Sequence, residues 1–120
     1  MQYALLFYNP PLSELPEPER EIRVTTMLAA MREWHEELTR AGVFRSMLRL
    51  APVESATSLR GQAGKVLVHD GPFAETKEIL GGLALLECAD LDEALRWARR
   101  CPLVQIGTVE VRPEWNAARA

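Results

Sequence analysis

Three carboxylates lie close together in segment 70–78, which reads Asp-Gly-Pro-Phe-Ala-Glu-Thr-Lys-Glu. Asp70, Glu75 and Glu78 are candidate catalytic residues, because a carboxylate held in a pocket can give or take a proton in an isomerisation or lyase step. Each also fits a plainer interpretation. Asp70 could cap its own turn, while Glu75 and Glu78 could belong to a solvated charged loop. A solvated loop, however, does not require the aromatic and glycine residues that surround these carboxylates.

Six residues in and near the segment are candidates for contact with a ligand. Arg60 could hold an anionic substrate through its planar guanidinium, or it could form a structural salt bridge to Glu75 or Glu78. His69 directly precedes Asp70, but neighbouring residues in a strand point to opposite faces, so the two do not form a catalytic pair by sequence alone. The candidate ligand-binding residues are Arg60, His69, Gly71, Pro72, Phe73 and Lys77.

No motif in the sequence indicates a catalytic nucleophile, a metal site or a cofactor. A Ser-His-Asp order is absent, and the two cysteines, Cys88 and Cys101, do not combine with the two histidines in the spacing of a zinc site. Two reduced thiols are expected rather than a disulfide, since small secreted domains that depend on disulfides usually carry more cysteines. We therefore expect no metal and no cofactor.

The composition limits the classes of protein and partner. Of the 120 residues, 48% are hydrophobic and 26% are charged, which suits one globular domain over residues 1–120 with a single core. The net charge of −3 and the scattered arginines argue against nucleic acid as the main partner, because phosphate binding needs a basic face. The apolar start of the chain is too short to span a bilayer and lacks a basic signal-peptide region. We therefore expect a cytoplasmic protein without membrane association.

Hydrophobic periodicity predicts two helices among several strands. A long helix is expected over residues 19–41, where apolar residues recur at three- and four-residue steps and Gly42 follows as a C-terminal cap. A shorter helix is expected between Asp90, as its N-cap, and Cys101, with Glu93 completing a capping box. The expected strands cover residues 3–8, 43–50, 57–60, 65–69, 83–88 and 104–112, and Gly61-Gln62-Ala63-Gly64 is typical of a hairpin turn.

This order of elements favours two helices packed on one face of an antiparallel sheet, a ferredoxin-like α+β sandwich. In strand 43–50, alternation would place Phe44 on the face of Leu48 and opposite Met47. The sheet face away from the helices would need a cover, and a second copy of the chain is the simplest one, so we expect a homodimer. A small-molecule pocket is expected between the sheet and the long helix, rimmed by the carboxylates and Phe73 of segment 70–78.

Segment 70–78 resembles the motif for which the DGPF family of YCII-related proteins is named. The likeness covers nearly the whole chain, including Trp34, Ala41-Gly42, Ala56-Thr57, Gly81-Gly82 and the run from Glu110 to Pro113. His69 departs from it, since relatives more often carry threonine there. The resemblance implies a YCII-related domain whose ferredoxin-like subunits pair as a dimeric α+β barrel, and it implies no settled reaction.

The resemblance leaves two functional hypotheses. Some members are similar to small ring-opening or dehalogenating enzymes, which agrees with a small-molecule-binding protein or acid/base enzyme whose pocket lies near segment 70–78. Others are encoded beside alternative sigma factors, which implies the alternative, a non-enzymatic interaction or regulatory protein associated with such a factor. An enclosed cavity at the carboxylates would favour the first hypothesis, and a solidly packed segment would favour the second.

Overall fold

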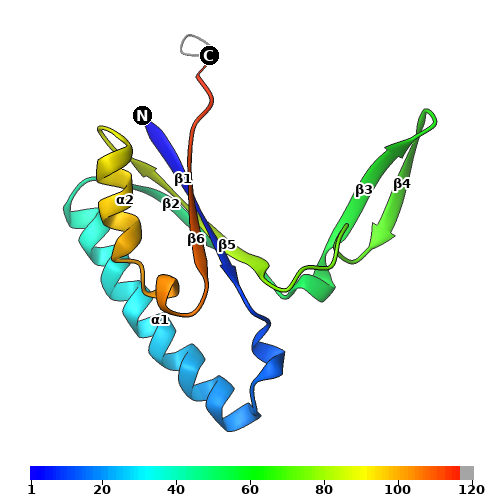
Figure 1. Ribbon diagram of the computed structural model, residues 1–120, viewed down its shortest axis with the longest axis horizontal. Helices are drawn as coiled ribbons and strands as arrows, with labels where there is room; N and C mark the ends of the chain where they lie inside the picture. Colours follow the sequence, from blue (N-terminus) through cyan, green and yellow to red (C-terminus); the bar gives the residue numbers. More distant parts are fainter. Residues whose placement is uncertain (117–120) are drawn as a thin grey trace.

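Two helices cover one side of a four-stranded antiparallel sheet, and a separate hairpin stands away from both (Figure 1). This computed structural model describes residues 1–116 and confirms the expected α+β class with a ferredoxin-like arrangement. No helix in that range has the length and hydropathy needed to cross a membrane. The elements are β1 (Gln2–Asn9), η1 (Leu12–Glu14), α1 (Glu17–Arg40), β2 (Phe44–Arg49), η2 (Val53–Ser55), β3 (Thr57–Gln62), β4 (Lys65–Asp70), β5 (Ile79–Glu87), α2 (Leu91–Arg99), η3 (Pro102–Gln105) and β6 (Thr108–Pro113), where η denotes a short 3₁₀ turn.

The strand order in the main sheet is β2-β5-β1-β6, so β1 is an inner strand, as its apolar sequence predicts. Alternate residues of β1 and β5 point toward the helices and form the core with α1 and α2. The indole Nε1 of Trp34 in α1 donates a hydrogen bond to the backbone carbonyl of Trp97 in α2 at 3.1 Å, which joins the two helices. The core includes Tyr3, Leu5, Phe7, Trp34, Leu38, Ala84, Leu86, Ala94 and Ala98.

The C-terminus of α1 and the N-terminus of α2 follow local signals in the sequence. The Gly42 N–H donates to the Thr39 carbonyl at 3.1 Å, and Gly42 has a φ of +76°, which glycine adopts without strain. At the start of α2 the Glu93 N–H donates to the Asp90 carboxylate at 2.9 Å. The Glu93 carboxylate in turn accepts from the Ala89 N–H, one residue earlier than in a standard capping box. Both predicted caps are therefore confirmed, the second in a shifted form.

The predicted orientation of Phe44, the first residue of β2, is wrong. β2 carries a β-bulge between Phe44 and Ser46, and these two residues oppose successive residues of β5. The bulge adds one residue to the strand and interrupts the alternation of faces. Phe44 therefore packs against the core together with Met47, instead of pointing to the opposite face with Leu48.

The last strand starts later than the sequence predicts. Residues 104–107 do not belong to it, because η3 and the turn after it occupy them, and β6 begins at Thr108. A Cβ placed on Gly107 would lie 2.1 Å from the Tyr8 carbonyl oxygen, so this turn lies directly against the end of β1. In contrast, β5 starts earlier than predicted and runs through Gly82.

Residues 57–70 form a two-stranded arm that projects from the body of the molecule (Figure 1). The predicted hairpin is therefore present, but its strands form a sheet of their own. Its two-residue turn, Ala63-Gly64, has positive φ at both positions, 52° and 78°, as a type I′ turn requires. Such a turn matches the twist of the strands, so the ribbon stays regular up to its tip.

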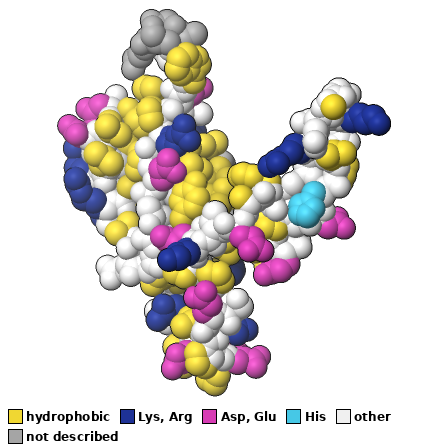
Figure 2. All heavy atoms as spheres, turned by 45° about the vertical axis from the view of Figure 1, so that its right-hand side comes forward, with side chains coloured by type: hydrophobic (Ala, Val, Ile, Leu, Met, Phe, Trp, Pro, Cys, Tyr) yellow, Lys and Arg dark blue, Asp and Glu magenta, His cyan; other side chains and the backbone are white. Residues whose placement is uncertain are grey.

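The face of the main sheet away from the helices carries apolar side chains that no helix among residues 1–116 covers. These residues alternate with the core residues along the strands, and Leu48 is the most exposed of them. Figure 2 shows hydrophobic side chains gathered on the body of the molecule next to the arm. We call this surface the open sheet face, and its apolar members are Ala4, Leu6, Leu48, Leu83 and Leu85.

Candidate functional site

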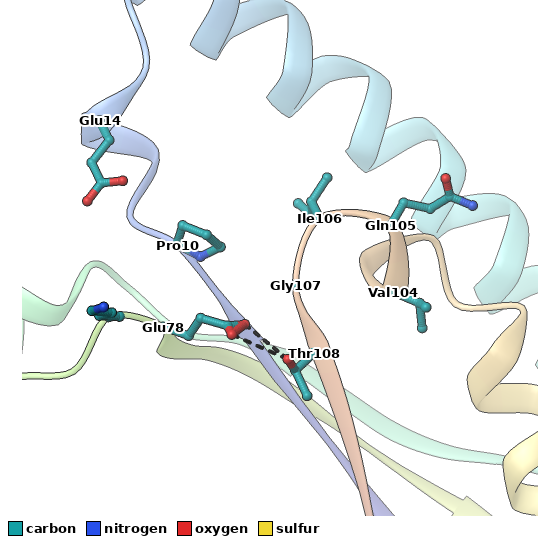
Figure 3. A pocket seen from close by; sticks show the side chains of 9 residues that line it. Pro10, Glu14, Glu78, Val104, Gln105, Ile106, Gly107 and Thr108 are labelled. Carbon is teal, nitrogen blue, oxygen red and sulfur yellow. Dashed lines mark hydrogen bonds between the residues drawn. The ribbon is translucent and has the colours of Figure 1, made fainter.

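An open cleft of about 680 Å³ lies where three separate parts of the chain meet (Figure 3). The loop after β1 and the turn η1 form one wall, and η3 with the start of β6 forms another. The end of segment 70–78 supplies the third part. The residues that line the cleft are Pro10, Glu14, Lys77, Glu78, Val104, Gln105, Ile106, Gly107 and Thr108.

Glu78 is the half-buried carboxylate of this cleft, and its position is fixed by two threonines. The Thr108 hydroxyl lies 3.1 Å from one carboxylate oxygen of Glu78 and 3.3 Å from the other, so it donates to the carboxylate (Figure 3). The Thr76 hydroxyl donates to the backbone carbonyl of Glu78 at 2.6 Å. The first contact orients the side chain, and the second fixes the backbone just before β5 begins.

Sheet register explains why Glu78 and Thr108 meet. The central strand β1 ends at Asn9, which pairs with Ile79 on one side, while Tyr8 pairs with Thr108 on the other. The residue before β5 and the first residue of β6 therefore lie on either side of the same strand end. The sequence predicts Thr108 only as part of a strand over residues 104–112, and its contact with Glu78 follows only from this pairing.

The cleft has the mixed lining expected of a small-molecule site. An ionised carboxylate can accept about four hydrogen bonds. The Thr108 hydroxyl fills only part of this capacity, so Glu78 can also accept a hydrogen bond from a bound ligand. Pro10, Val104 and Ile106 provide apolar surface, and Lys77 adds a cation beside the carboxylate. A pocket with apolar walls and a few convergent polar groups is typical of ligand sites.

The start of segment 70–78 lies apart from the cleft, at the base of the arm. Asp70 is the last residue of β4 and is exposed. Gly71 has a φ of +108°, its N–H donates to the Ala56 carbonyl at 2.7 Å, and its carbonyl accepts from the Ser58 hydroxyl at 2.8 Å. This geometry requires glycine and closes the base of the arm.

The middle of the segment is solvent-exposed. Phe73 is 80% exposed and does not anchor the loop against any residue among 1–116, although Pro72 before it is half-buried. Glu75 is exposed and does not line the cleft. Of the nine residues in segment 70–78, Lys77 and Glu78 alone line the cleft.

Arg60 and His69 lie on the arm, where they share one face. The register pairs Arg60 with Leu67 and Ser58 with His69, and both side chains are exposed. None of the ion pairs within residues 1–116 includes Arg60, so the alternative of a salt bridge to Glu75 or Glu78 is not found there. The chain thus separates its candidate residues into a cleft group, an arm group and the exposed loop between them.

The two cysteines are buried and free, as expected. Burial raises the pKa of Cys101 to about 11, and burial followed by the neighbouring Glu93 carboxylate raises the pKa of Cys88 to about 11. Both thiols are therefore protonated near neutral pH and are poor nucleophiles. Residues 1–116 hold no group of three or more His, Cys, Asp or Glu side chains that could bind a metal ion.

Comparisons with known proteins cover almost the full length of the chain. The model of the YCII-related domain matches residues 1–116. A relative from Rhizobium meliloti (strain 1021), "Uncharacterized protein R00369", is 42% identical over 116 residues, which is 94% of this chain and 91% of the relative. A solved structure of 5-chloro-2-hydroxyhydroquinone dehydrochlorinase (TftG) from Burkholderia phenoliruptrix AC1100, in complex with 2,5-dihydroxybenzoquinone, is similar with a TM-score of 0.54 and 14% identity, over 99% of this chain and 98% of that one. At that identity the similarity shows a shared fold. The family match over residues 1–116 and the 42% identical relative show that the chain belongs to the YCII-related domain family.

Proposed function

We propose that this protein binds a small, hydroxyl-bearing organic molecule in the cleft, and that Glu78 is the group that accepts a hydrogen bond or a proton from it. The observation that carries the proposal is the half-buried Glu78 carboxylate, oriented by Thr108 and bordered by apolar walls. A carboxylate held in this way is suited to general acid/base chemistry, because it is fixed in place and retains free acceptor positions. The ligand in the TftG complex is a hydroxylated ring, which supports the choice of ligand class.

Asp70 and Glu75 remain weaker candidates for the catalytic role, and the other residues of the segment remain candidates for ligand contact. Both carboxylates are exposed and lie outside the cleft. The structural role of Gly71 favours the interpretation of Asp70 as part of a turn at the base of the arm. Glu78 is therefore ranked first among the three carboxylates.

We also propose that the protein works as a cytoplasmic homodimer in which the open sheet face is covered by a second copy. Leu6, Leu83 and Leu85 on this face are only half-buried, and Leu48 is exposed. A contiguous apolar sheet face is unfavourable in water, and identical subunits can bury it in a two-fold contact.

The binding proposal is tested with a panel of small hydroxylated aromatic compounds that includes 2,5-dihydroxybenzoquinone. A compound that binds should raise the melting temperature, since 100-fold excess over Kd stabilises a folded protein by about 2.7 kcal/mol. Titration calorimetry on Glu78→Gln should then show affinity reduced by about tenfold or more, the effect of one lost hydrogen bond to a charged group. Glu36→Gln, on the exposed side of α1, serves as the matched control and should bind like the unmodified protein.

The same titrations rank the three carboxylates. Asp70→Asn and Glu75→Gln should retain binding if the cleft is the site. A loss of binding in either variant would instead indicate that the ligand binds at the loop. Proton transfer to Glu78 from a carbon of the ligand would appear as deuterium incorporation in D₂O, measured by mass spectrometry. A panel with no stabilising compound, or an unchanged affinity in Glu78→Gln, would contradict the proposal.

A further inference from the structure

The arm, residues 57–70, is a two-stranded ribbon with an open edge along each strand. β3 and β4 pair with each other, and no further strand among residues 1–116 pairs with either of them. The ribbon stands off from the helices and the main sheet (Figure 1). An open strand edge presents a row of backbone N–H and C=O groups and is a template for one more strand. The arm can therefore bind a chain segment through its backbone.

The register shows which backbone groups of β4 face outward. At the base of the arm the Gly71 N–H donates to the Ala56 carbonyl at 2.7 Å, and the strand register continues from this pair toward the tip. In an antiparallel ladder, hydrogen-bonded pairs alternate with pairs whose N–H and C=O groups point away from the partner strand. Counted from Gly71, the outward groups on β4 belong to Val66, Val68 and Asp70.

β4 is the better template of the two edges. All six of its residues are exposed, and the β-branched Val66 and Val68 favour an extended strand. The register of the arm runs without a bulge and β4 contains no proline, so this edge lacks two devices with which natural sheets block strand addition. The edge of β3 is weaker, because Gly61 occupies one of its outward positions and glycine destabilises a strand.

The two faces of the arm differ in chemistry, and a strand added beside β4 would meet both of them. One face is aliphatic and about two-thirds exposed, and its members are Leu59, Val66 and Val68. The other face is exposed and lacks acidic residues, and its basic members are Arg60, Lys65 and His69. None of these three takes part in an ion pair within residues 1–116. Figure 2 shows basic side chains along the arm.

We propose that the outer edge of β4 binds an extended segment of another protein in which aliphatic and acidic residues alternate. Successive residues of a strand point to opposite faces. Such a segment therefore places its aliphatic side chains beside Val66 and Val68 and its carboxylates beside Lys65 and His69, while its backbone bonds to the outward groups of β4. In strand addition of this kind the main chain supplies affinity and the side chains supply specificity. The inference goes beyond the proposed function, because it concerns neither the cleft nor the open sheet face.

A short peptide that alternates valine and glutamate, labelled with a fluorophore, is the probe. Fluorescence anisotropy with the full chain should show saturable binding with a Kd below about 1 mM. Two methylated forms test the backbone contact, one with methyl groups on the valine nitrogens and one with methyl groups on the glutamate nitrogens. These two sets of N–H groups lie on opposite edges of an extended peptide. One form should therefore bind about tenfold or more weakly, and the other should lose less than about twofold.

Two proline substitutions in one cross-strand pair block opposite edges of the arm. Leu59 and Val68 face each other in a pair whose N–H groups point outward, so proline at either position leaves the hydrogen bonds between β3 and β4 in place. Val68→Pro should weaken peptide binding about tenfold or more, and Leu59→Pro less than about threefold. Amide NMR shifts of the arm check that the ribbon stays formed. The methylated peptides act on the unmodified protein, so they decide the question even where a proline disturbs the arm.

A charge exchange tests the acidic character of the bound segment. Lys65→Glu should weaken binding of the valine–glutamate peptide about threefold or more and should strengthen binding of a valine–lysine peptide, because cross-strand charge pairs change sign. Arg23→Glu makes the same change at an exposed position of α1 and should alter neither affinity. Equal effects of the two substitutions would mean that net charge alone governs binding.

Four results would overturn the inference. They are the absence of saturable binding, equal losses in the two methylated peptides, a larger loss in Leu59→Pro than in Val68→Pro, and equal responses to Lys65→Glu and Arg23→Glu. Sedimentation equilibrium adds one more outcome. If Val68→Pro lowers self-association and leaves peptide affinity unchanged, the edge of β4 belongs to a contact between copies of this chain, and the inference fails.

Discussion

Replacing Leu48 by threonine should weaken the proposed dimer through the open sheet face. Leu48 lies in the edge strand β2, opposite Leu83 of β5, and is the most exposed apolar residue of that face. Threonine has a β-branched side chain suited to a strand, so the sheet itself should tolerate the change. The effect should therefore appear in association rather than in folding.

The magnitude follows from the exposed area. Complete burial of a leucine side chain contributes about 1.5–3 kcal/mol, and Leu48 still has 56% of its surface to bury. Each subunit would thus gain about 0.8–1.7 kcal/mol from this residue, and a two-fold contact uses it twice. Threonine keeps about half of the apolar area, so the substitution should cost the dimer about 1–2 kcal/mol, or about 5- to 30-fold in Kd.

Sedimentation equilibrium measures this directly, and Ile22→Thr provides the control. Ile22 is 68% exposed on α1, away from both the open sheet face and the arm, so its replacement should leave Kd unchanged. Equal effects of the two substitutions would mean that general surface hydrophobicity drives association. An unchanged Kd in Leu48→Thr would refute the reasoning that this sheet face is buried between two copies.

Three further predictions concern the folded subunit. Gly82→Ala should lower the free energy of unfolding by about 1–3 kcal/mol in urea titrations, because a Cβ there would lie 2.7 Å from the Leu48 carbonyl oxygen. Gly61→Ala is the control: a Cβ at Gly61 meets nothing within 4 Å, so the substitution should cost less than about 1 kcal/mol. Trp34→Phe should cost about 1 kcal/mol through the lost hydrogen bond to the Trp97 carbonyl, and Trp115→Phe, at an exposed position, should leave the melting temperature unchanged. Because burial raises the pKa of Cys101 from 9.0 to about 11, its contribution to stability should be complete below pH 9 and lost as the pH rises from 9 through about 11. Urea titrations across this range should show a steeper loss for the unmodified protein than for Cys101→Ala, and equal slopes would contradict the assignment.

Features set by a few neighbouring residues could be predicted from the sequence. The Gly42 cap depends on a left-handed residue after a helical repeat, and the Asp90 cap depends on a carboxylate three residues before a backbone donor. The end of the chain, residues 114–120, illustrates the limit of prediction from such local signals. The sequence predicts a frayed tail over residues 114–120, with Trp115 as the residue that could dock it; Trp115 is 78% exposed, and residues 117–120 lie outside those described.

Features set by pairing between distant strands could not be predicted. The position of Phe44 depends on a bulge that exists only because β2 pairs with β5. The separation of the arm from the main sheet has the same origin, since a hairpin sequence does not specify what lies beside it. Thr108 was missed as a partner of Glu78 because the contact arises at the end of a third strand, β1.

The structure divides segment 70–78 into two halves with different physical tasks. In the first half, Gly71 adopts a positive φ and binds Ala56 and Ser58 through its backbone, so this half closes the base of the arm. In the second half, Thr76 and Thr108 hold Glu78 at the cleft. The two interpretations weighed for the carboxylates therefore apply to different members of the segment, because a turn-forming Asp70 and a chemically available Glu78 do not exclude each other.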